Sequence, residues 1–182
     1  MSEFYRSRKD EEKELVKKFE NHIKGNDFHF FDVEELEKVV DIYLDDDRNK
    51  KALQAIEFAV EQFPFSIELI VLHAHVLATL HQYELALEAL EKAENIQPND
   101  VDLLLTKANI LTIDGKNNEA IDCLQRAMDM AEDTDEILYQ IGMAYQQMGK
   151  FDLAIEHYKQ VLEINIDHDN ATYELAYCLD IT

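Results

Sequence analysis

Histidine and aspartate side chains can bind a metal ion, so their spacing in this sequence is the first question. His73 and His75 are the nearest candidates for a ligand pair. On a helix, residues two apart point about 200° away from each other, so these two imidazoles cannot share one ion. The acidic run at residues 45–47 lacks the alternating ligands, central glycine and final glutamate of a calcium loop. The sequence therefore predicts no metal site, and it predicts a solvated turn between helices for this acidic run.

Catalytic groups are the second question. The sequence contains no nucleophile elbow, phosphate-binding glycine loop, zinc-binding helix motif or kinase signature. Cys123 and Cys178 stand far apart in the sequence, each within a predicted helix. Two isolated cysteines in a charged chain indicate small buried side chains in a reducing compartment. We therefore predict a cytoplasmic protein that is not an enzyme and needs no cofactor.

Charge is unevenly placed along the chain. The formal net charge is −22, of which residues 1–32 contribute −1 and the remainder −21. Nucleic-acid binding needs clustered Lys and Arg, so the acidic remainder predicts no nucleic-acid partner. The N-terminal residues MSEFYRSRKD lack the apolar core of a secretory signal. The longest apolar run, around Leu69–Leu80, is too short to span a bilayer, so no membrane insertion is expected.

The elements that position these side chains recur at a fixed period along the sequence, and Asp135–His168 is one whole unit. In this unit, the predicted helices Glu136–Met148 and Phe151–Ile164 are joined by the turn Gly149-Lys150. Alanine returns at one place in each second helix, at Ala52, Ala86, Ala120 and Ala154. Small side chains let two helices approach closely, so these alanines should lie where the second helix of a unit crosses the first. A fixed period of this length is typical of stacked helix pairs.

At these residues the chain resembles the tetratricopeptide repeat family. The residues that fit the family pattern are Tyr43, Ala59, Pro64, Ala93, Pro98, Ala127, Leu138, Gly142, Tyr145, Ala154 and Tyr158. Val40 departs from it where a small residue is usual, and Glu132 and Ile166 stand where proline is common. The resemblance covers Val33 to the end of the sequence. It implies an all-α fold, a right-handed α-α superhelix (solenoid) of antiparallel helix pairs, with units 33–66, 67–100, 101–134 and 135–168 and a partial unit 169–182.

Periodicity and turn residues also predict where the helices of this region begin and end. The expected helices outside the unit already described are Val33–Asp46, Arg48–Gln62, Ile67–Leu80, Tyr83–Asn95, Val101–Ile113, Asn117–Met130 and Ala171–Asp180. Ser66, Asp100 and Thr134 each stand just before a first helix. We predict that all three cap it, by accepting hydrogen bonds from backbone N–H groups that have no partner within the helix.

Residues 1–32 are expected to form a separate N-terminal segment. Residues 1–9 are predicted to be a mobile basic arm that carries Arg6, Arg8 and Lys9. An amphipathic helix should follow over Asp10–Lys24 and end at Gly25, and an aromatic linker with Phe28, Phe30 and Phe31 comes next. We interpret the helix and the aromatic residues as a cover for the apolar end of the first repeat. A recognition motif is the alternative.

The candidate binding residues lie on the first helix of each unit, in three columns that share one helical face. The acidic first column is Glu34, Glu68, Asp102 and Glu136, the second is Glu37, Val71, Leu105, Tyr139 and Tyr173, and the third is Asp41, His75, Asn109, Met143 and Tyr177. By resemblance, this face lines the concave groove in which the family commonly holds an extended peptide or a helix. Two simpler roles compete with binding: acids in a first turn complement the helix dipole, and the apolar members can pack between repeats.

Family members that bind the acidic C-terminal tails of heat-shock chaperones use Lys, Arg and Asn in these columns. Only Asn109 matches that set, so the resemblance argues against a chaperone-tail clamp. We therefore expect a non-catalytic scaffold that binds a peptide or helical segment of a partner protein, apolar or basic in character. The groove candidates are Glu68, Val71, His75, Leu105, Asn109, Glu136, Tyr139, Met143, Tyr173 and Tyr177.

Two alternative functions follow from the last predicted helix, Ala171–Asp180, which has no following helix and carries apolar residues on more than one face. The first is a self-assembling structural unit, a homodimer or larger oligomer formed through this helix. The second is a regulatory segment of a larger protein. We therefore expect either that the chain is a piece of a longer repeat array or that this end is buried in a dimer.

Overall fold

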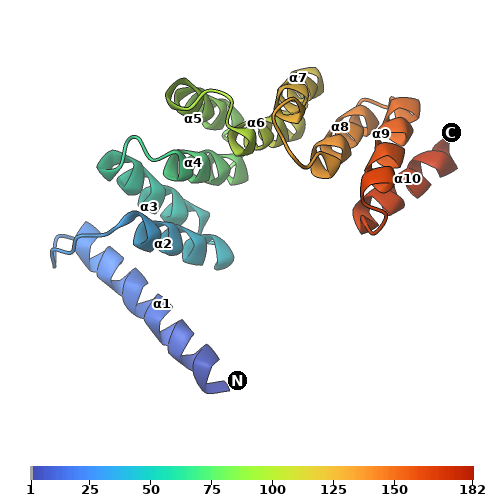
Figure 1. Cartoon of the computed structure of the whole chain (residues 1–182). Helices are drawn as coiled ribbons and strands as arrows, with labels where there is room; N and C mark the ends of the chain where they lie inside the picture. Colours follow the sequence, from blue (N-terminus) through green and yellow to red (C-terminus); the bar gives the residue numbers. More distant parts are fainter. Residues whose placement is uncertain (1) are drawn as a thin grey trace. The chain divides into compact units, whose positions relative to one another are not determined.

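The computed structural model describes residues 2–182 of the chain, and the side chains from residue 9 onward. Within that range every regular element is an α-helix, and there are ten of them (Figure 1). They are α1 (Ser2–Ile23), α2 (Val33–Asp45), α3 (Asn49–Gln62), α4 (Ile67–Thr79), α5 (Tyr83–Ile96), α6 (Val101–Ile113), α7 (Asn117–Met128), α8 (Asp135–Gln147), α9 (Phe151–Ile164) and α10 (Asp169–Ile181). The first helices α2, α4, α6, α8 and α10 start at residues 33, 67, 101, 135 and 169, so they keep the constant spacing of the sequence. The predicted all-α fold is confirmed.

Helix α1 is longer than the sequence suggested. It begins at Ser2 rather than at Asp10, so the prediction of a mobile arm is wrong for residues 2–9, while Met1 lies outside the described residues. Residues 2–9 contain neither glycine nor proline, so nothing in them interrupts the helical hydrogen bonds toward the N-terminus.

The chain divides into two compact units, one that ends at Ala89 and one that begins at Leu90, and the division falls within α5. In the first unit, α2 packs against α3, α3 packs against α4, and α2 also contacts α4. Ala52, Ala55 and Ala59 of α3 are fully buried in its core. Their small side chains let α3 approach its neighbours closely, as the alanine spacing predicted.

Helix α1 packs against α2 and supplies part of the cover for the first unit. Phe19 is 2% exposed, and its ring makes edge contacts with Phe31 and Phe58, with 5.7 Å between centroids in both pairs. Phe28 and Phe30 are 87% and 74% exposed, so they do not take part in the cover. The prediction that all three linker phenylalanines cover the first repeat is therefore wrong for Phe28 and Phe30 and confirmed for Phe31, which is 4% exposed.

In the second unit, α7 packs against α6 and α8, and α9 packs against α8 and α10. Gly142 of α8 shows how closely α8 and α9 approach. A Cβ atom at residue 142 would lie 2.6 Å from Cε1 of Tyr158, a fully buried residue of α9. The Tyr158 hydroxyl donates to Oε1 of Gln146 at 2.7 Å, which holds the ring in that position. The glycine is therefore needed for the helix crossing.

A carboxylate network joins three helices of the second unit. Glu94, at the end of α5, accepts hydrogen bonds from Nζ of Lys107 on α6 at 2.9 Å and from Arg126 on α7 at 2.7 Å. The hydrogen bond from Lys107, followed by that from Arg126, lowers the pKa of the Glu94 carboxyl. This partly buried contact helps to fix α6, one of the first helices, against its neighbours.

The helix starts agree with the capping prediction except at one position. Ser66 and Asp100 accept hydrogen bonds from the backbone N–H groups of Leu69 and Leu103, and so cap α4 and α6. The prediction for Thr134 is wrong, because its side chain makes no capping bond. Its backbone has φ −117° and ψ −2°, a helical conformation rather than the extended one from which a capping side chain reaches back.

Left-handed backbone recurs at the turn inside each repeat unit. Positive φ values occur at Asp47 (56°), His81 (59°), Gly115 (79°) and Gly149 (71°), and each of these positions is one sequence period after the previous one. The glycines at 115 and 149 were expected to take this conformation. The structure adds that Asp47 and His81 occupy the same place in their units.

Candidate functional site

The three predicted columns lie on the first helices, and we call these side chains, taken within each compact unit by itself, the first-helix face. Its residues are Glu34, Glu37 and Asp41 on α2, Glu68, Val71 and His75 on α4, Asp102, Leu105 and Asn109 on α6, Glu136, Tyr139 and Met143 on α8, and Tyr173 and Tyr177 on α10. Members on one helix are three or four residues apart and so lie on one side of it. In the first unit α2 contacts α4, and in the second α6 contacts α8, so packing brings the columns of these pairs side by side.

Carboxylates crowd the part of the face that lies in the first unit. Burial raises the pKa of Glu37, and repulsion from Glu68, Asp41 and Glu34 raises it further. Burial also raises the pKa of Asp41. Helix α4 thus places its Glu68 near the acids of α2, where each negative charge disfavours the next. A positively charged group in this place would relieve that repulsion.

The other members on α4 differ in their environments. Glu68 is exposed and accepts a hydrogen bond from the Ser66 hydroxyl at 2.9 Å. Hydrogen bonds from its own backbone N–H and from Ser66 lower the pKa of Glu68, so it stays ionised. His75 is exposed and Val71 is half-buried. The face in this unit is therefore mainly acidic.

Aromatic and sulfur-containing side chains form the corresponding part of α8 in the second unit. Tyr139 and Met143 are partly buried and pack against the core around Tyr158. The Tyr139 ring lies between those of Tyr158 and His168, with centroid distances of 5.9 Å and 4.9 Å. Burial, followed by repulsion from nearby carboxylates, raises the pKa of the Tyr139 hydroxyl. Tyr139 and Met143 thus support the packing of α8, and only part of each side chain is open to a partner.

The remaining candidates of the second unit are more accessible. Tyr173 and Tyr177 of α10 are 72% and 47% exposed. Asn109 and Glu136 are exposed as well, whereas Leu105 is half-buried. The accessible aromatic surface of the face therefore lies on α10.

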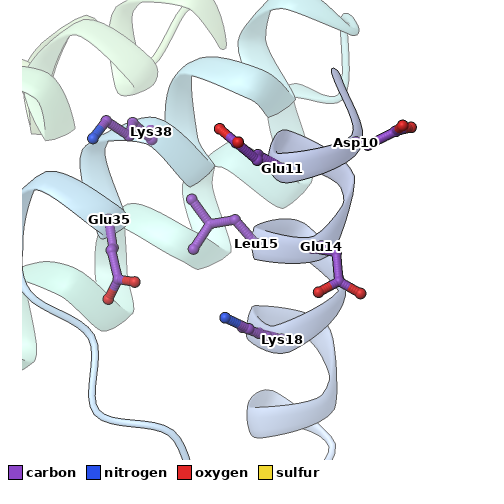
Figure 2. Close-up of a pocket in the computed structure, with 7 residues that line it drawn as sticks. All are labelled: Asp10, Glu11, Glu14, Leu15, Lys18, Glu35 and Lys38. Atoms are coloured by element: carbon purple, nitrogen blue, oxygen red, sulfur yellow. The ribbon is translucent and has the colours of Figure 1, made fainter. Parts of the chain in front are cut away.

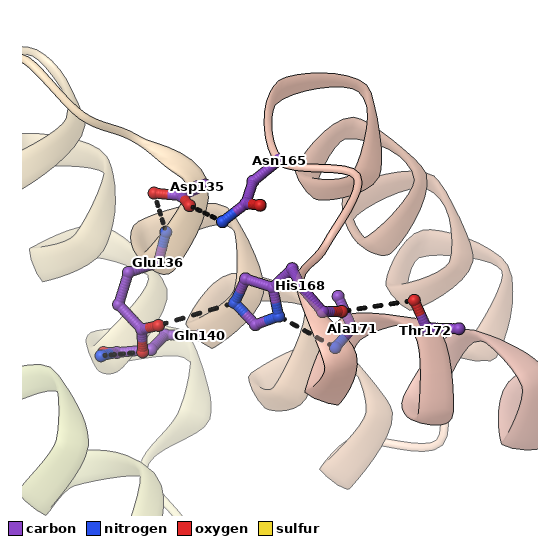
Figure 3. A network of polar contacts seen from close by, with 7 residues as sticks. All are labelled: Asp135, Glu136, Gln140, Asn165, His168, Ala171 and Thr172. Atoms are coloured by element: carbon purple, nitrogen blue, oxygen red, sulfur yellow. Dashed lines mark hydrogen bonds and ion pairs between the residues drawn. The ribbon is translucent and has the colours of Figure 1, made fainter.

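His168 is not a member of the three columns, and it joins this surface from the turn between α9 and α10 (Figure 3). Its Nδ1 atom accepts a hydrogen bond from the backbone N–H of Ala171 at 3.1 Å, which caps α10. Its Nε2 atom lies 3.8 Å from Oε2 of Glu136. The sequence signal was present, because His168 stands one period after Thr134 in the capping position, but histidine is not among the residues usually expected there.

Two hollows in the first unit lie beside α1, and one of them includes a residue of the candidate face. One has a volume of about 540 Å³ and is lined by α1 and α2, where Leu15 and Lys18 point toward α2 and Asp10 points away (Figure 2). The other, of about 600 Å³, includes Asp41 of the third column and Lys9 of α1. Both are open and lined by charges of both signs, so neither resembles an enclosed small-molecule site.

Metal ligands, membrane-spanning helices and cysteines were also compared with the predictions, for the described residues. Among them, no group of three or more His, Cys, Asp or Glu side chains is arranged to hold a metal ion. No helix formed by those residues has the length and apolar character needed to cross a membrane. Cys123 and Cys178 are both buried and unpaired.

Comparison with protein families gives two matches, both to models described as the tetratricopeptide repeat. One covers residues 100–167 and the other residues 67–100. Together the matched residues, 67–167, make up more than half of the 182-residue chain. No curated protein sequence matches the chain.

Several solved structures resemble this one. TTC0263, a thermophilic TPR protein of Thermus thermophilus, has a TM-score of 0.73 and 23% identity over 90% of this chain and 88% of its own. YrrB, described as a TPR protein with an unusual peptide-binding site, has a TM-score of 0.65 and 22% identity over 76% of this chain and 72% of its own. MamA has a TM-score of 0.66 and 19% identity over 84% of this chain and 85% of its own. At such identities the similarity shows the fold, which is the helical-repeat fold predicted from the sequence.

Proposed function

The chain belongs to the tetratricopeptide repeat family, and from that premise we propose that it is a non-catalytic adaptor whose first-helix face binds a segment of another protein. Proteins of this family and fold are generally scaffolds rather than enzymes. The similar structure of YrrB is described as having a peptide-binding site, which agrees with the proposal without locating a site here. Within each unit, neighbouring first helices contact each other and present their side chains side by side, which suits an elongated partner segment.

The observation that carries the proposal is the exposed aromatic surface of α10. Tyr173 and Tyr177, at 72% and 47% exposed, continue the columns of Tyr139 and Met143. Tyrosine buries a large apolar area while keeping a polar group in water, and it is enriched where proteins bind one another. Half-buried Tyr139 and Met143 extend this apolar surface onto α8, so the partner segment should supply apolar side chains.

Charge defines the second property of the proposed partner. In the first unit, burial and then like charge raise the pKa values of Glu37 and Asp41, so these acids destabilise that unit when ionised. Lys or Arg side chains of a partner would reverse that effect. The repeat region also carries most of the net charge of −22, which favours association with a basic segment. We therefore propose a partner segment that is both apolar and basic.

Fluorescence anisotropy with two synthetic peptides tests this proposal. A leucine–lysine peptide should bind, and a leucine–glutamate peptide of equal length should not. The double substitution Tyr173→Ala/Tyr177→Ala should weaken binding of the first peptide at least about fivefold, the effect expected for truncating an important interface tyrosine. Both side chains are exposed, so this variant should keep the fold.

The matched control is Phe28→Ala/Phe30→Ala, which removes two exposed aromatic side chains outside the first-helix face. It should leave peptide binding unchanged. Equal binding of the peptide by the wild type and the double tyrosine variant would contradict the proposed site. Equal binding of the two peptides would contradict the proposed charge.

We also propose that the adaptor works in the cytoplasm. Its two cysteines are buried and unpaired, as in proteins of reducing compartments. Cells that produce the protein are lysed in denaturant, which exposes the buried thiols, and a thiol-alkylating reagent is present during lysis. Both cysteines should be labelled. A disulfide at either residue would contradict the proposal.

Self-association through α10 is the second candidate function, favoured by Leu179 and Ile181, which are 54% and 47% exposed on the same helix as Tyr177. The charge of −22 on each copy opposes it at low salt. Light scattering across a concentration range distinguishes the two functions. A mass that rises with concentration, and that Leu179→Glu returns to the monomer value, would establish self-association.

A further inference from the structure

His168 lies where α8, the turn after α9 and the start of α10 meet (Figure 3). Its side chain is 11% exposed, and its ring lies 4.9 Å from that of Tyr139 with 39° between the planes. The two ring nitrogens face different partners. Nδ1 is 3.1 Å from the backbone N of Ala171, and Nε2 is 3.8 Å from a carboxylate oxygen of Glu136. A single imidazole therefore contacts two residues of the first-helix face and the first turn of α10.

These contacts determine which nitrogen of the neutral His168 ring carries the proton. The Ala171 N–H group donates, so Nδ1 has to accept and cannot carry a proton. The neutral ring then carries its proton on Nε2, which faces Glu136. A protonated ring has N–H groups at both nitrogens, and its Nδ1–H would oppose the N–H of Ala171. Protonation therefore removes the cap of α10 and strengthens the attraction between the ring and Glu136.

The charged groups near the ring are carboxylates. Helix α8 contributes Asp135, which interacts electrostatically with His168, and Glu136. The neutral Tyr139 side chain packs against the ring, and the exposed acids Asp167 and Asp169 flank His168 in the sequence. Asp135 accepts a hydrogen bond from the Asn165 amide at 2.9 Å, so this carboxylate already has a close partner. Glu136 accepts a longer hydrogen bond, 3.3 Å, from the Gln140 amide, but it is 58% exposed and remains open to a ligand.

We infer that His168 is a positioning residue of the first-helix face and that its protonation weakens the binding of a basic segment there. This inference rests on the proposed function. The neutral ring supports Tyr139, caps α10 beside Tyr173 and leaves the charge of Glu136 available. The imidazolium neutralises Glu136, adds a positive charge and releases the start of α10. All of these changes act against a basic ligand, and histidine changes its charge between about pH 5 and 8.

His168→Asn separates the two roles of the residue, because asparagine is a good N-cap that does not titrate. The matched control is His81→Asn, which removes an exposed imidazole from a turn outside the first-helix face and keeps a residue that tolerates left-handed backbone. Affinity for the leucine–lysine peptide is measured for the wild type and both variants from about pH 8 to pH 5. The wild type and His81→Asn should lose up to about fivefold more affinity than His168→Asn over this range, the effect of one partly exposed charge contact.

A second measurement does not need the peptide. The ring resonances of Tyr139 in NMR spectra should shift between about pH 8 and pH 5 in the wild type, and should not shift over the same range in His168→Asn. Nitrogen shifts should place the proton of the neutral His168 ring on Nε2. Parallel pH profiles of the wild type and His168→Asn, in affinity or in the Tyr139 resonances, would overturn the inference. Failure of the peptide to bind at any pH would contradict the proposed function and, with it, the effect of His168 on binding. Tyr139 resonances that respond to pH in the wild type alone would then show that the contact between the two rings is correct and that the failure lies with the proposed function.

Discussion

Single residues in the turns store backbone strain that differs from one repeat unit to the next. Asp47, His81, Gly115 and Gly149 all have positive φ at equivalent positions, and glycine alone takes this conformation without a steric penalty. Side-chain crowding is not a second factor at Gly115, since a Cβ there would have no atom within 4 Å. A substitution at this position therefore measures the backbone effect by itself.

We predict that Gly115→Ala destabilises the protein by about 1 kcal/mol, the penalty for a left-handed non-glycine residue. Gly115→Asn should destabilise the protein less than Gly115→Ala does, because asparagine tolerates the left-handed conformation. Urea denaturation followed by circular dichroism measures both. If the Gly115→Ala variant were as stable as the wild type or more stable, residue 115 would not have the left-handed conformation.

The environment of Glu37 predicts how the stability of the fold depends on pH. Its pKa is raised in the folded protein by burial and by Glu68, Asp41 and Glu34. The folded state therefore disfavours the ionised form, and the resulting loss of stability is complete above the folded pKa. The loss disappears as the pH falls below the ordinary value of 4.5, where the carboxyl is protonated in both states.

Glu37→Gln should accordingly stabilise the protein at neutral pH by about 0.5–1 kcal/mol, the sum expected from relieving a few like-charge pairs on helix surfaces. The gain should shrink toward zero below pH 4.5. Thermal unfolding at several pH values measures it, with Glu57→Gln on α3 as the control for loss of an exposed charge. A neutral-pH gain that persists unchanged in acid would rule out this explanation.

At the scale of the elements, the crossing of α8 with α9 depends on the absence of a side chain at Gly142. Two effects of adding a methyl group compete there. Alanine favours a helix over glycine by about 1 kcal/mol, but its Cβ would lie 2.6 Å from the buried Tyr158 ring. Tyr158 cannot move aside freely, because it is fully buried and hydrogen-bonded to Gln146.

We therefore predict that overpacking wins and that Gly142→Ala has a net destabilising effect of about 1–2 kcal/mol. The smaller side chain in Tyr158→Leu should make the same Gly142→Ala change less harmful, a coupling that a double-mutant cycle measures. Independent, additive effects of the two substitutions would show that the helices do not meet at this point.

For the whole molecule, the dominant property is a net charge of −22. Self-repulsion of this size opposes the compact state and is screened by salt, whose Debye length falls from about 30 Å at 0.01 M to about 8 Å at 0.15 M. Ion pairs such as Glu94 with Lys107 and Arg126 are weakened by the same screening, but they are few beside the excess of acids.

The melting temperature should therefore rise as sodium chloride is added over this range. Potassium chloride at equal ionic strength should give the same rise, because screening does not depend on the identity of the cation. A melting temperature that falls with salt would mean that the ion pairs outweigh the repulsion.

Much of the fold could be predicted from the sequence, because helices are encoded locally. The constant repeat spacing, the alanines at the crossings and the turn glycines placed the helices of the repeat region close to their observed bounds. The start of α1 was missed because its charged first residues show no apolar periodicity, although nothing in them prevents a helix. The cap at Thr134 was misjudged because residue type alone does not specify φ and ψ.

The candidate face, too, was predicted in part from the sequence and decided in part by the tertiary structure. Sequence periodicity selected its columns, since residues three and four apart on a helix must share a side. Which members are accessible was decided by tertiary packing: Tyr139 lies between Tyr158 and His168, while Tyr173 is exposed. The approach of Glu68 to Glu37, and of His168 to Glu136, joins residues of different helices. Contacts of this kind depend on helix crossings and side-chain rotamers, which no local pattern in the sequence records.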